Sequence, residues 1–326
     1  LQSARGVCRR SQHELGVLAR YVERLKPEIV VLMHLNVHQI SLAKWRPSFP
    51  VKIRGILLSP YIPISRARGL SEKLRVGITG IRKRLQIKYM LRQAMLDRVF
   101  VLNDQKVADL FNRWYPKRSI FEAIVDPLPV AVTQCIPQPF KSEAGAFRFL
   151  IAGAISRRKG VLETLKALRC VLDAGSSPVE LRVVGKFPHS PYRLAVETTA
   201  EKLLAKHGKR FSFTLIDHFV DFQELSNEFA STDCVLIPYL KFYGSSGMIG
   251  HAIYHDKPIV ACDSGLIGEI VQHYGLGETV DPKNDYKFAD CLRLIMQEKL
   301  NRRNKTGASI VRSREFATDL PENWLK

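Results

Sequence analysis

Apolar and polar positions along the chain follow two alternating spacings. Short runs rich in β-branched residues, such as EIVVLMH at 28–34, VKIRGILLS at 51–59 and RVFVLN at 98–103, are separated by stretches in which apolar residues recur every three or four positions. The first spacing is typical of strands and the second of amphipathic helices. This alternation predicts an α/β protein.

A Pro-rich and irregular stretch at 126–146 interrupts the alternation. Such composition is typical of a connection between domains. We therefore expect an N-terminal Rossmann-like domain at 1–140, a C-terminal one at 141–310, and a tail at 311–326 that packs back on the N-terminal domain.

The pattern after this stretch is very regular. Five apolar runs are expected to be strands: FRFLIAG at 147–153, VELRVVG at 179–185, FSFTLID at 211–217, CVLIP at 234–238 and KPIVACD at 257–263. Continuous apolar runs are typical of parallel strands buried on both faces, so they predict a doubly wound sheet. Asp221 and Glu224 in DFQE form a capping box that predicts the start of a helix.

Two loops at the expected carboxyl edge of this sheet carry residues suited to an anion. AGAISRRKG at 152–160 places Lys159 just before a helix, where a cation is unfavourable unless an anion is bound. GSSG at 244–247 would offer free backbone N–H groups at the start of another helix. Each loop alone is also consistent with a solvated turn or a plain helix cap, but together on one edge they favour a phosphate site.

These blocks, in their order and spacing, resemble the retaining glycosyltransferases of the GT-B fold in the group 1 family, over roughly residues 146–300. The matching segments are FLIAGAISRRKGVLETLKAL, LRVVGKF, DHFVDFQELSNEFASTDCVLIPY, YGSSGMIGHAIYHDKPIVACDSGLIGEIV and GLGETVDP. The resemblance implies two Rossmann-like, doubly wound parallel-sheet domains that face a cleft. It also implies a nucleotide-diphosphate sugar donor on the C-terminal domain, an acceptor on the N-terminal domain, and no metal or other cofactor.

The same resemblance assigns roles to individual residues. Lys159 matches the lysine that contacts the donor diphosphate, with Arg158 beside it as a second catalytic candidate. Fixed donors there would stabilise the negative charge that grows on the leaving diphosphate. The full set of expected donor-binding residues is Gly153, Ala154, Lys159, Gly185, Tyr243, Gly244, Ser245, Ser246, Gly247, Met248, His251 and Glu269.

Several positions depart from the family pattern. Two glutamates commonly lie eight positions apart, at places that Tyr243 and His251 occupy here. His251 is a candidate for the ribose side of the donor, or a packed helix residue. Glu269 is a candidate near the sugar or nucleoside, or a first-turn helix carboxylate that needs no ligand. Ala154 replaces a common arginine, for which the arginines three and four positions later are substitutes.

The N-terminal half offers three acceptor-side candidates. His34, His38 and Ser59 follow the ends of expected strands, although His34 is equally consistent with a packed core residue. The first βα elements of the family are missing from the chain, so we expect a truncated N-terminal domain.

The segment 65–98 combines a narrow apolar stripe with many arginines and lysines. This pattern is typical of a helix lying on an anionic membrane. The alternative is an amphipathic helix that packs on its own domain, and Gly77 and Gly80 weaken any continuous helix.

The net charge of +19 and the sequence pI of about 9.8 call for partners that are polyanionic, such as nucleic acid, an anionic membrane or phosphorylated ligands. No nucleic-acid-binding motif accompanies the charge, so we expect no nucleic acid partner. Six cysteines without paired spacing indicate buried thiols in a reducing compartment. No apolar run is long enough to span a bilayer. We therefore expect a cytoplasmic protein, peripheral on the inner face of the plasma membrane.

The sequence thus predicts a retaining transferase that moves a sugar from a nucleotide diphosphate to a glycan or lipid-linked acceptor in cell-surface polysaccharide synthesis. Three alternatives stay open. They are a nucleic-acid-binding protein, a catalytically silent GT-B module that binds a nucleotide, a glycan or a partner protein, and, with less support, a nucleotide-sugar epimerase.

Overall fold

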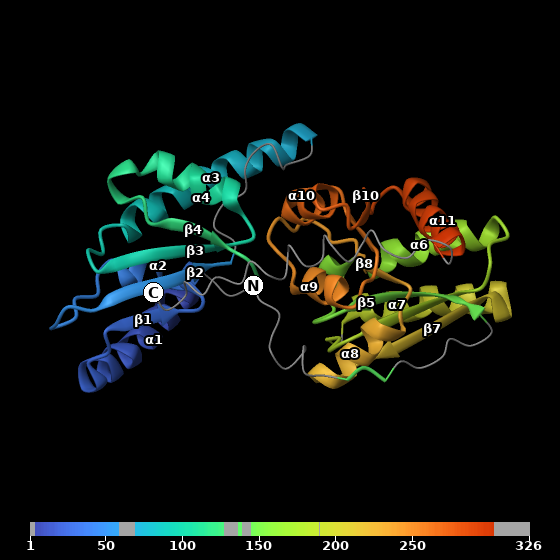
Figure 1. The fold of residues 1–326 in the computed structure, drawn as a ribbon, viewed down its shortest axis with the longest axis horizontal. Coiled ribbons are helices and arrows are strands. Elements are labelled where there is room, and N and C mark those ends of the chain that lie inside the picture. Colours follow the sequence, from blue (N-terminus) through green and yellow to red (C-terminus); the bar gives the residue numbers. More distant parts are fainter. Residues whose placement is uncertain (1–3, 59–68, 127–135, 139–144, 189, 303–326) are drawn as a thin grey trace. The chain divides into compact units, whose positions relative to one another are not determined.

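The computed structural model describes residues 4–58, 69–126, 136–138, 145–188 and 190–302. Its residues fall into two compact units (Figure 1). Among the described residues, the first contains those up to Asp126 together with Tyr243–Ser245, and the second contains the others. The expected domain boundary at 140 and the expected tail at 311–326 lie outside the described residues.

The first unit is built on a parallel sheet of four described strands in the order β1-β2-β3-β4. The chain visits these strands in sequence, with a helix in each connection. Its elements are α1 (Ala4–Leu25), β1 (Ile29–Leu32), α2 (Leu35–Leu42), β2 (Lys52–Leu57), α3 (Gly69–Met90), β3 (Leu96–Leu102), α4 (Gln105–Trp114), the 3₁₀ turn η2 (Pro116–Arg118) and β4 (Phe121–Ile124).

Helix α3 is continuous across both of its internal glycines, contrary to the expectation that they would weaken it. Gly80 lies on the buried face together with Val76 and Ile87. Packing of that face compensates for the low helix propensity of glycine.

The second unit is built on a parallel sheet of six described strands in the order β10-β9-β8-β5-β6-β7. The order reverses at β5, which lies between β6 and β8, and this makes the sheet doubly wound. Its elements are β5 (Phe147–Ala152), η4 (Arg157–Lys159), α6 (Val161–Asp173), β6 (Val179–Val184), α7 (Pro191–His207), η5 (Gly208–Arg210), β7 (Phe211–Ile216), α8 (Phe222–Ser231), β8 (Cys234–Ile237), α9 (Gly247–Tyr254), β9 (Ile259–Cys262), α10 (Gly265–His273), β10 (Gly277–Val280) and α11 (Asp285–Arg302).

Helices cover this sheet in two groups. Helix α6 packs against α7 and α11, whereas α8 packs against α9. Every residue of β5, β8 and β9 is buried, which explains why these strands are continuous apolar runs in the sequence. The predicted N-cap also forms, because the Asp221 carboxylate accepts the Glu224 N–H at 2.8 Å at the start of α8, while the Glu224 carboxylate lies 2.9 Å from His218 Nε2.

Three buried charges, Arg148, Glu180 and Glu228, form a network in the second unit with the partly buried Arg182. Glu180 on β6 accepts from Arg148 at 2.7 Å and from Arg182 at 3.2 Å. Arg182 also donates two hydrogen bonds to Glu228 on α8, at 2.6 and 2.7 Å. The network ties β5, β6 and α8 together, away from the loops at the carboxyl edge of the sheet.

Candidate functional site

β5 leads into the first of the two loops with anion-binding features. After Ala152 the chain turns through Gly153, enters η4, and adopts a φ of +72° at Gly160 before α6 begins. A Cβ at Gly160 would lie only 2.3 Å from the Pro238 carbonyl oxygen. Glycine is therefore required here both by the backbone conformation and by the approach to the end of β8.

The Lys159 side chain turns inward from this loop and is only 5% exposed. Its Nζ donates to the Ala152 carbonyl oxygen at 2.8 Å and to the Tyr239 hydroxyl. Burial lowers the pKa of Lys159 to about 7, and the Arg158 guanidinium contributes in the same direction. An ammonium group held by uncharged partners in a low dielectric is stabilised by any anion that approaches it.

Arg158 is half-buried beside the lysine. Its guanidinium lies over the Phe242 ring at 4.4 Å and over the Tyr239 ring at 5.0 Å, so two aromatic faces hold the charge. The Arg158 carbonyl accepts the Leu240 N–H at 2.8 Å. The turn before α6 and the chain after β8 are thus joined through both backbone and side chains.

The second loop leads from the end of β8 into α9, with Ser246 as the N-cap residue. The Ser246 side chain makes no capping hydrogen bond to the helix. Its Oγ instead lies 3.1 Å from the Tyr239 hydroxyl. The first-turn amides of α9 follow directly at Gly247 and Met248, where a helix presents unsatisfied N–H donors.

The two loops meet around the lysine. A Cβ at Gly153 would lie 3.1 Å from Lys159 Nζ and 3.9 Å from Met248 Sδ. The structure therefore brings Gly153, Lys159, Ser246 and Met248 into one cluster at the carboxyl edge of the sheet. Gly185 supports the cluster from β6, because a Cβ there would lie 2.3 Å from the Gly153 carbonyl oxygen.

Other predicted donor residues lie less close to the lysine. Ala154 is exposed in the loop after Gly153. Tyr243, Gly244 and Ser245 group with the first unit, in which Asn103 Nδ2 donates to Ser245 Oγ at 2.6 Å.

His251 and Glu269 take up different environments. His251 is buried on α9 and stacks on the Phe229 ring at 5.1 Å, and burial lowers its pKa, which favours a neutral imidazole. Its Nδ1 has no hydrogen-bond partner among the described residues. Glu269 is half-buried on α10, which begins at Gly265, so the expectation of a first-turn carboxylate was wrong: the helix starts earlier than the sequence pattern indicated.

The acceptor-side candidates are also separated by their environments. His34 is exposed at the N-cap position of α2, so its alternative interpretation as a core residue was wrong. His38 faces α1, where its Nδ1 lies 3.1 Å from Ser11 Oγ and its Nε2 lies 3.5 Å from Glu14 Oε2. Burial lowers the pKa of His38, which opposes the effect of the Glu14 carboxylate. Ser59 lies outside the described residues.

In the part of the chain that the structure describes, no group of three or more His, Cys, Asp or Glu side chains is placed to hold a metal ion. Within the same part, Cys170, Cys234, Cys262 and Cys291 are free thiols; Cys234 and Cys262 are buried as expected, whereas Cys170 and Cys291 are half-buried. No helix among these residues is both long and apolar enough to cross a bilayer.

Sequence reasoning did not identify Tyr239, although this residue contacts both Lys159 and Ser246. The signal was its place directly after the CVLIP run, at the carboxyl end of β8. Asn103 was missed as well. It follows β3 immediately and has a φ of +55°, which marks a constrained position for a residue other than glycine.

The residues of the lysine cluster lie in a segment that is similar in sequence to a known protein family. Residues 146–298 match the family described as glycosyl transferases group 1. The matched segment begins just before β5 and ends within α11 of the second unit. The match includes both loops of the lysine cluster and all six described strands of the sheet. No curated protein matches the chain.

Solved structures show that the fold is of the GT-B type. The sucrose-phosphate synthase of Thermosynechococcus elongatus matches with a TM-score of 0.69 and 17% identity, over 98% of this chain and 76% of that one. A UDP-forming trehalose-phosphate synthase of Burkholderia vietnamiensis matches with a TM-score of 0.65 and 14% identity, over 97% and 75%. Anabaena HepE in complex with UDP matches with a TM-score of 0.61 and 15% identity, over 94% and 77%. The chain thus spans about three quarters of these proteins, in agreement with the expected truncation.

Proposed function

We propose that the protein is a retaining glycosyltransferase that moves a sugar from a nucleotide-diphosphate donor to a glycan or lipid-linked acceptor, without a metal ion, in cell-surface polysaccharide synthesis. The observation that carries the proposal is the buried Lys159 ammonium beside the N-terminus of α9. Breaking the bond between the sugar and the diphosphate leaves negative charge on the phosphate oxygens. A lysine, a serine hydroxyl and helix amides in fixed positions would stabilise that charge.

The donor phosphates are proposed to lie against Gly153, Lys159, Ser246, Gly247 and Met248. Arg158 would add positive charge at the same edge, because its guanidinium is held close by the two aromatic rings. UDP is the first donor nucleotide to test, since one of the similar structures contains UDP and another belongs to a UDP-forming enzyme.

The remaining expected residues would define the nucleoside and sugar ends of the donor site. His251 is proposed on the ribose side, where a neutral imidazole can both donate and accept a hydrogen bond. Ala154, Gly185 and Glu269 would complete this side, and Tyr243–Ser245 would extend the phosphate loop. We propose His34, His38 and Ser59 as acceptor-side residues.

A thermal-shift measurement with UDP, GDP, ADP and CMP tests the donor class. A ligand present at 100 times its Kd adds about 2.7 kcal/mol to stability, which raises the Tm by a few degrees. We expect one diphosphate to do this, and Lys159→Ala to abolish the shift. Lys166→Ala, an exposed lysine on α6, is the matched control and should behave as the wild type. A folded protein that responds to none of the four would overturn the proposal.

A catalytically silent GT-B module is the second candidate. It is favoured by Tyr243 and His251, which stand where the family commonly carries two glutamates. The two candidates differ in turnover: the transferase releases UDP from a UDP-sugar when acceptor is supplied, whereas the silent module binds UDP and releases none. Single-turnover release of UDP with a bacterial lipid extract as acceptor distinguishes them.

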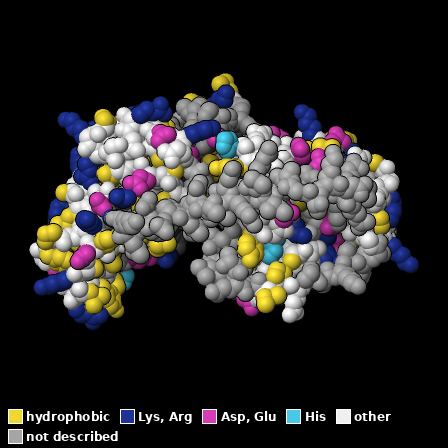
Figure 2. Space-filling view, in the orientation of Figure 1, with side chains coloured by type: hydrophobic (Ala, Val, Ile, Leu, Met, Phe, Trp, Pro, Cys, Tyr) yellow, Lys and Arg dark blue, Asp and Glu magenta, His cyan; other side chains and the backbone are white. Residues whose placement is uncertain are grey.

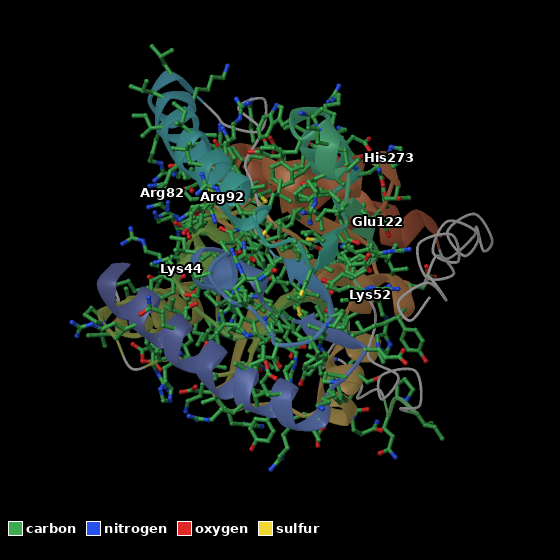
Figure 3. All side chains as sticks on the ribbon, turned by 90° about the vertical axis from the view of Figure 1, so that its left-hand side faces the viewer. Lys44, Lys52, Arg82, Arg92, Glu122 and His273 are labelled. Atoms are coloured by element: carbon green, nitrogen blue, oxygen red, sulfur yellow. The ribbon has the colours of Figure 1, made fainter. Side chains whose placement is uncertain are left out.

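We also propose that α3 binds the anionic inner face of the plasma membrane and holds the enzyme there as a peripheral, cytoplasmic protein. Its outward face carries a stripe of aliphatic side chains, each at least 62% exposed: Leu70, Leu74, Ile78, Ile81 and Leu85. Exposed basic side chains flank the stripe: Lys73, Arg75, Arg82, Arg84 and Lys88. Figure 3 shows Arg82 and Arg92 along this side of the first unit, and Figure 2 shows Lys and Arg side chains mixed with hydrophobic ones over its surface.

The charge around the stripe favours lipid over a second copy of the chain. Two such helices would bring their basic flanks together, whereas anionic headgroups attract each basic residue by about 1 kcal/mol. We expect the protein to sediment with vesicles that contain phosphatidylglycerol and not with phosphatidylcholine vesicles. Ile78→Glu should weaken sedimentation about tenfold or more. Leu194→Glu on α7 is the control, because Leu194 is 66% exposed and Ile78 is 65% exposed.

A dimer through α3, measured by equilibrium sedimentation and abolished by Ile78→Glu, would replace the membrane proposal. Equal binding to both vesicle types would also contradict it.

A further inference from the structure

Tyr239 occupies a position between the two anion-binding loops of the second unit. It follows β8 and Pro238, is only 3% exposed, and its hydroxyl lies within hydrogen-bond distance of both Lys159 Nζ and Ser246 Oγ. The phenol ring is fixed independently of the hydroxyl, because it packs against Phe242 at 5.5 Å and lies under the Arg158 guanidinium. The hydroxyl is therefore held in place by the ring and has little freedom to choose other partners.

The chemistry of Lys159, Tyr239 and Ser246 indicates which group donates each hydrogen bond and which group accepts it. An ammonium group can only donate hydrogen bonds, so the Tyr239 oxygen must accept from Lys159 when the lysine is charged. The Tyr239 proton can then be donated to Ser246 Oγ, which lies 3.1 Å away. Because Ser246 accepts at that contact, its own proton is free for a group outside the chain of three.

We infer that Tyr239 is a positioning residue that makes Lys159 and Ser246 act together on one phosphate group, with the Ser246 hydroxyl as the outgoing donor to a phosphate oxygen. The inference rests on the proposed function, because it assigns the phosphate of the donor to this cluster. It adds Tyr239 to the residues of the two loops, and it adds the order of donation from Lys159 to Tyr239 to Ser246.

The polarity reverses when the lysine loses its proton. A neutral amine can accept from Tyr239, so the tyrosine proton turns toward Lys159 and Ser246 donates to the tyrosine oxygen. Ser246 then presents only lone pairs to a ligand, and these repel a phosphate. Loss of one proton thus removes both a positive charge and an outgoing donor, so phosphate binding and protonation of the cluster are coupled.

The neighbouring groups support a change of charge near neutral pH. Arg158 from η4 is the charged group that faces the lysine, and it disfavours the ammonium form together with burial. Tyr239 faces the Cys262 thiol of β9 and Ser246 of α9, and burial raises the pKa of Tyr239, so the phenol keeps its proton. Of the three hydrogen-bonded groups, Lys159 is therefore the one that gains or loses a proton near neutral pH.

Calorimetric titration with UDP and with inorganic pyrophosphate tests the inference. Tyr239→Phe keeps the ring and removes only the hydroxyl, and Ser246→Ala removes the outgoing donor. At pH 6 each variant should bind about tenfold more weakly than the wild type, as expected for loss of a hydrogen bond to a charged group. The double variant should bind no more weakly than either single variant, because both substitutions break the same chain. Tyr286→Phe, at a 77% exposed tyrosine on α11, should have no effect.

The pH dependence gives a second test that does not need Tyr239→Phe to fold. Calorimetry at pH 8.5 in buffers of different ionisation enthalpy should show that the wild type takes up about one proton when UDP binds, because the ligand selects the charged form of a lysine whose pKa is about 7. Binding of UDP without proton uptake, or losses that multiply in the double variant, would overturn the inference and leave the proposed function intact. Absence of binding of both ligands to the wild type at pH 6 would overturn both.

Discussion

Lys159 places a titratable group inside a folded domain, and this has a consequence for stability. Burial lowers the pKa of Lys159 to about 7, far below the value near 10.4 in an unfolded chain. Between these two values the unfolded state holds one more proton than the folded state, so the free energy of unfolding rises with pH. The lysine thus destabilises the ligand-free protein most at and below neutral pH.

We predict that Lys159→Met removes this pH dependence. From pH 7 to pH 9 the wild type should gain about 2 kcal/mol of stability relative to the variant, measured by urea unfolding at each pH. Comparing the two proteins cancels the titration of all other groups. An equal change with pH in both proteins would mean that Lys159 keeps an ordinary pKa in the folded state.

The residues of the candidate site differ in how far they could be predicted from the sequence. Lys159 and Ser246 lie in loops whose composition is unusual for a helix start, so a local pattern was enough to make them candidates, and the structure places both beside Tyr239. Tyr239 could not be found in the same way, because its partners come from η4 and from α9 and meet only in the folded sheet. Likewise, the exposure of His34 depends on where α2 begins, which the sequence pattern did not define.

The buried ion network of β5, β6 and α8 makes these elements depend on one another. Glu228 is 3% exposed and accepts two hydrogen bonds from the partly buried Arg182, so removing its charge takes the carboxylate away from a guanidinium that is poorly hydrated. Breaking a buried ion pair by removing one partner costs about 3–5 kcal/mol.

We predict that Glu228→Gln lowers the free energy of unfolding by about 3 kcal/mol, measured with a chemical denaturant. Glu224→Gln on the same helix is the control. Glu224 pairs with His218 in an exposed position, so its substitution should cost less than about 1 kcal/mol. Similar losses for the two variants would show that the network contributes no more than a surface pair.

The strands of the second unit were predictable because parallel strands that are buried on both faces must be apolar throughout. Helix α3 was harder, since its glycines argued against a continuous helix and its outward stripe resembles a core face. Only the structure separates the buried Val76, Gly80 and Ile87 from the exposed stripe. The sequence alone therefore could not tell which apolar residues of α3 pack on the first unit and which are exposed to solvent.

The molecule as a whole consists of two units with separate hydrophobic cores. One core gathers on the six-stranded sheet of the second unit and another on the four-stranded sheet of the first. Residues of the lysine cluster belong to the second unit. A ligand that binds to the second unit can therefore stabilise the local structure around that core without changing the stability of the first core.

We predict that UDP slows amide hydrogen exchange at 157–161 and 239–249 and leaves β1 to β4 unchanged, as measured by mass spectrometry on the full chain. Bound phosphates would order the two loops directly, while the first core makes no expected contact with them. Lys159→Ala should abolish the protection. Protection confined to the first unit would place the nucleotide elsewhere.

The position of β5 also bears on how the chain is made. The ribosome releases β5, β6 and β7 long before β8, yet β5 pairs with both β6 and β8. Until Cys234 emerges, the central strand of the future sheet is an apolar edge that can pair with another chain. A nascent or shortened polypeptide that ends before β8 should therefore aggregate, and productive folding must wait for the second half of the domain.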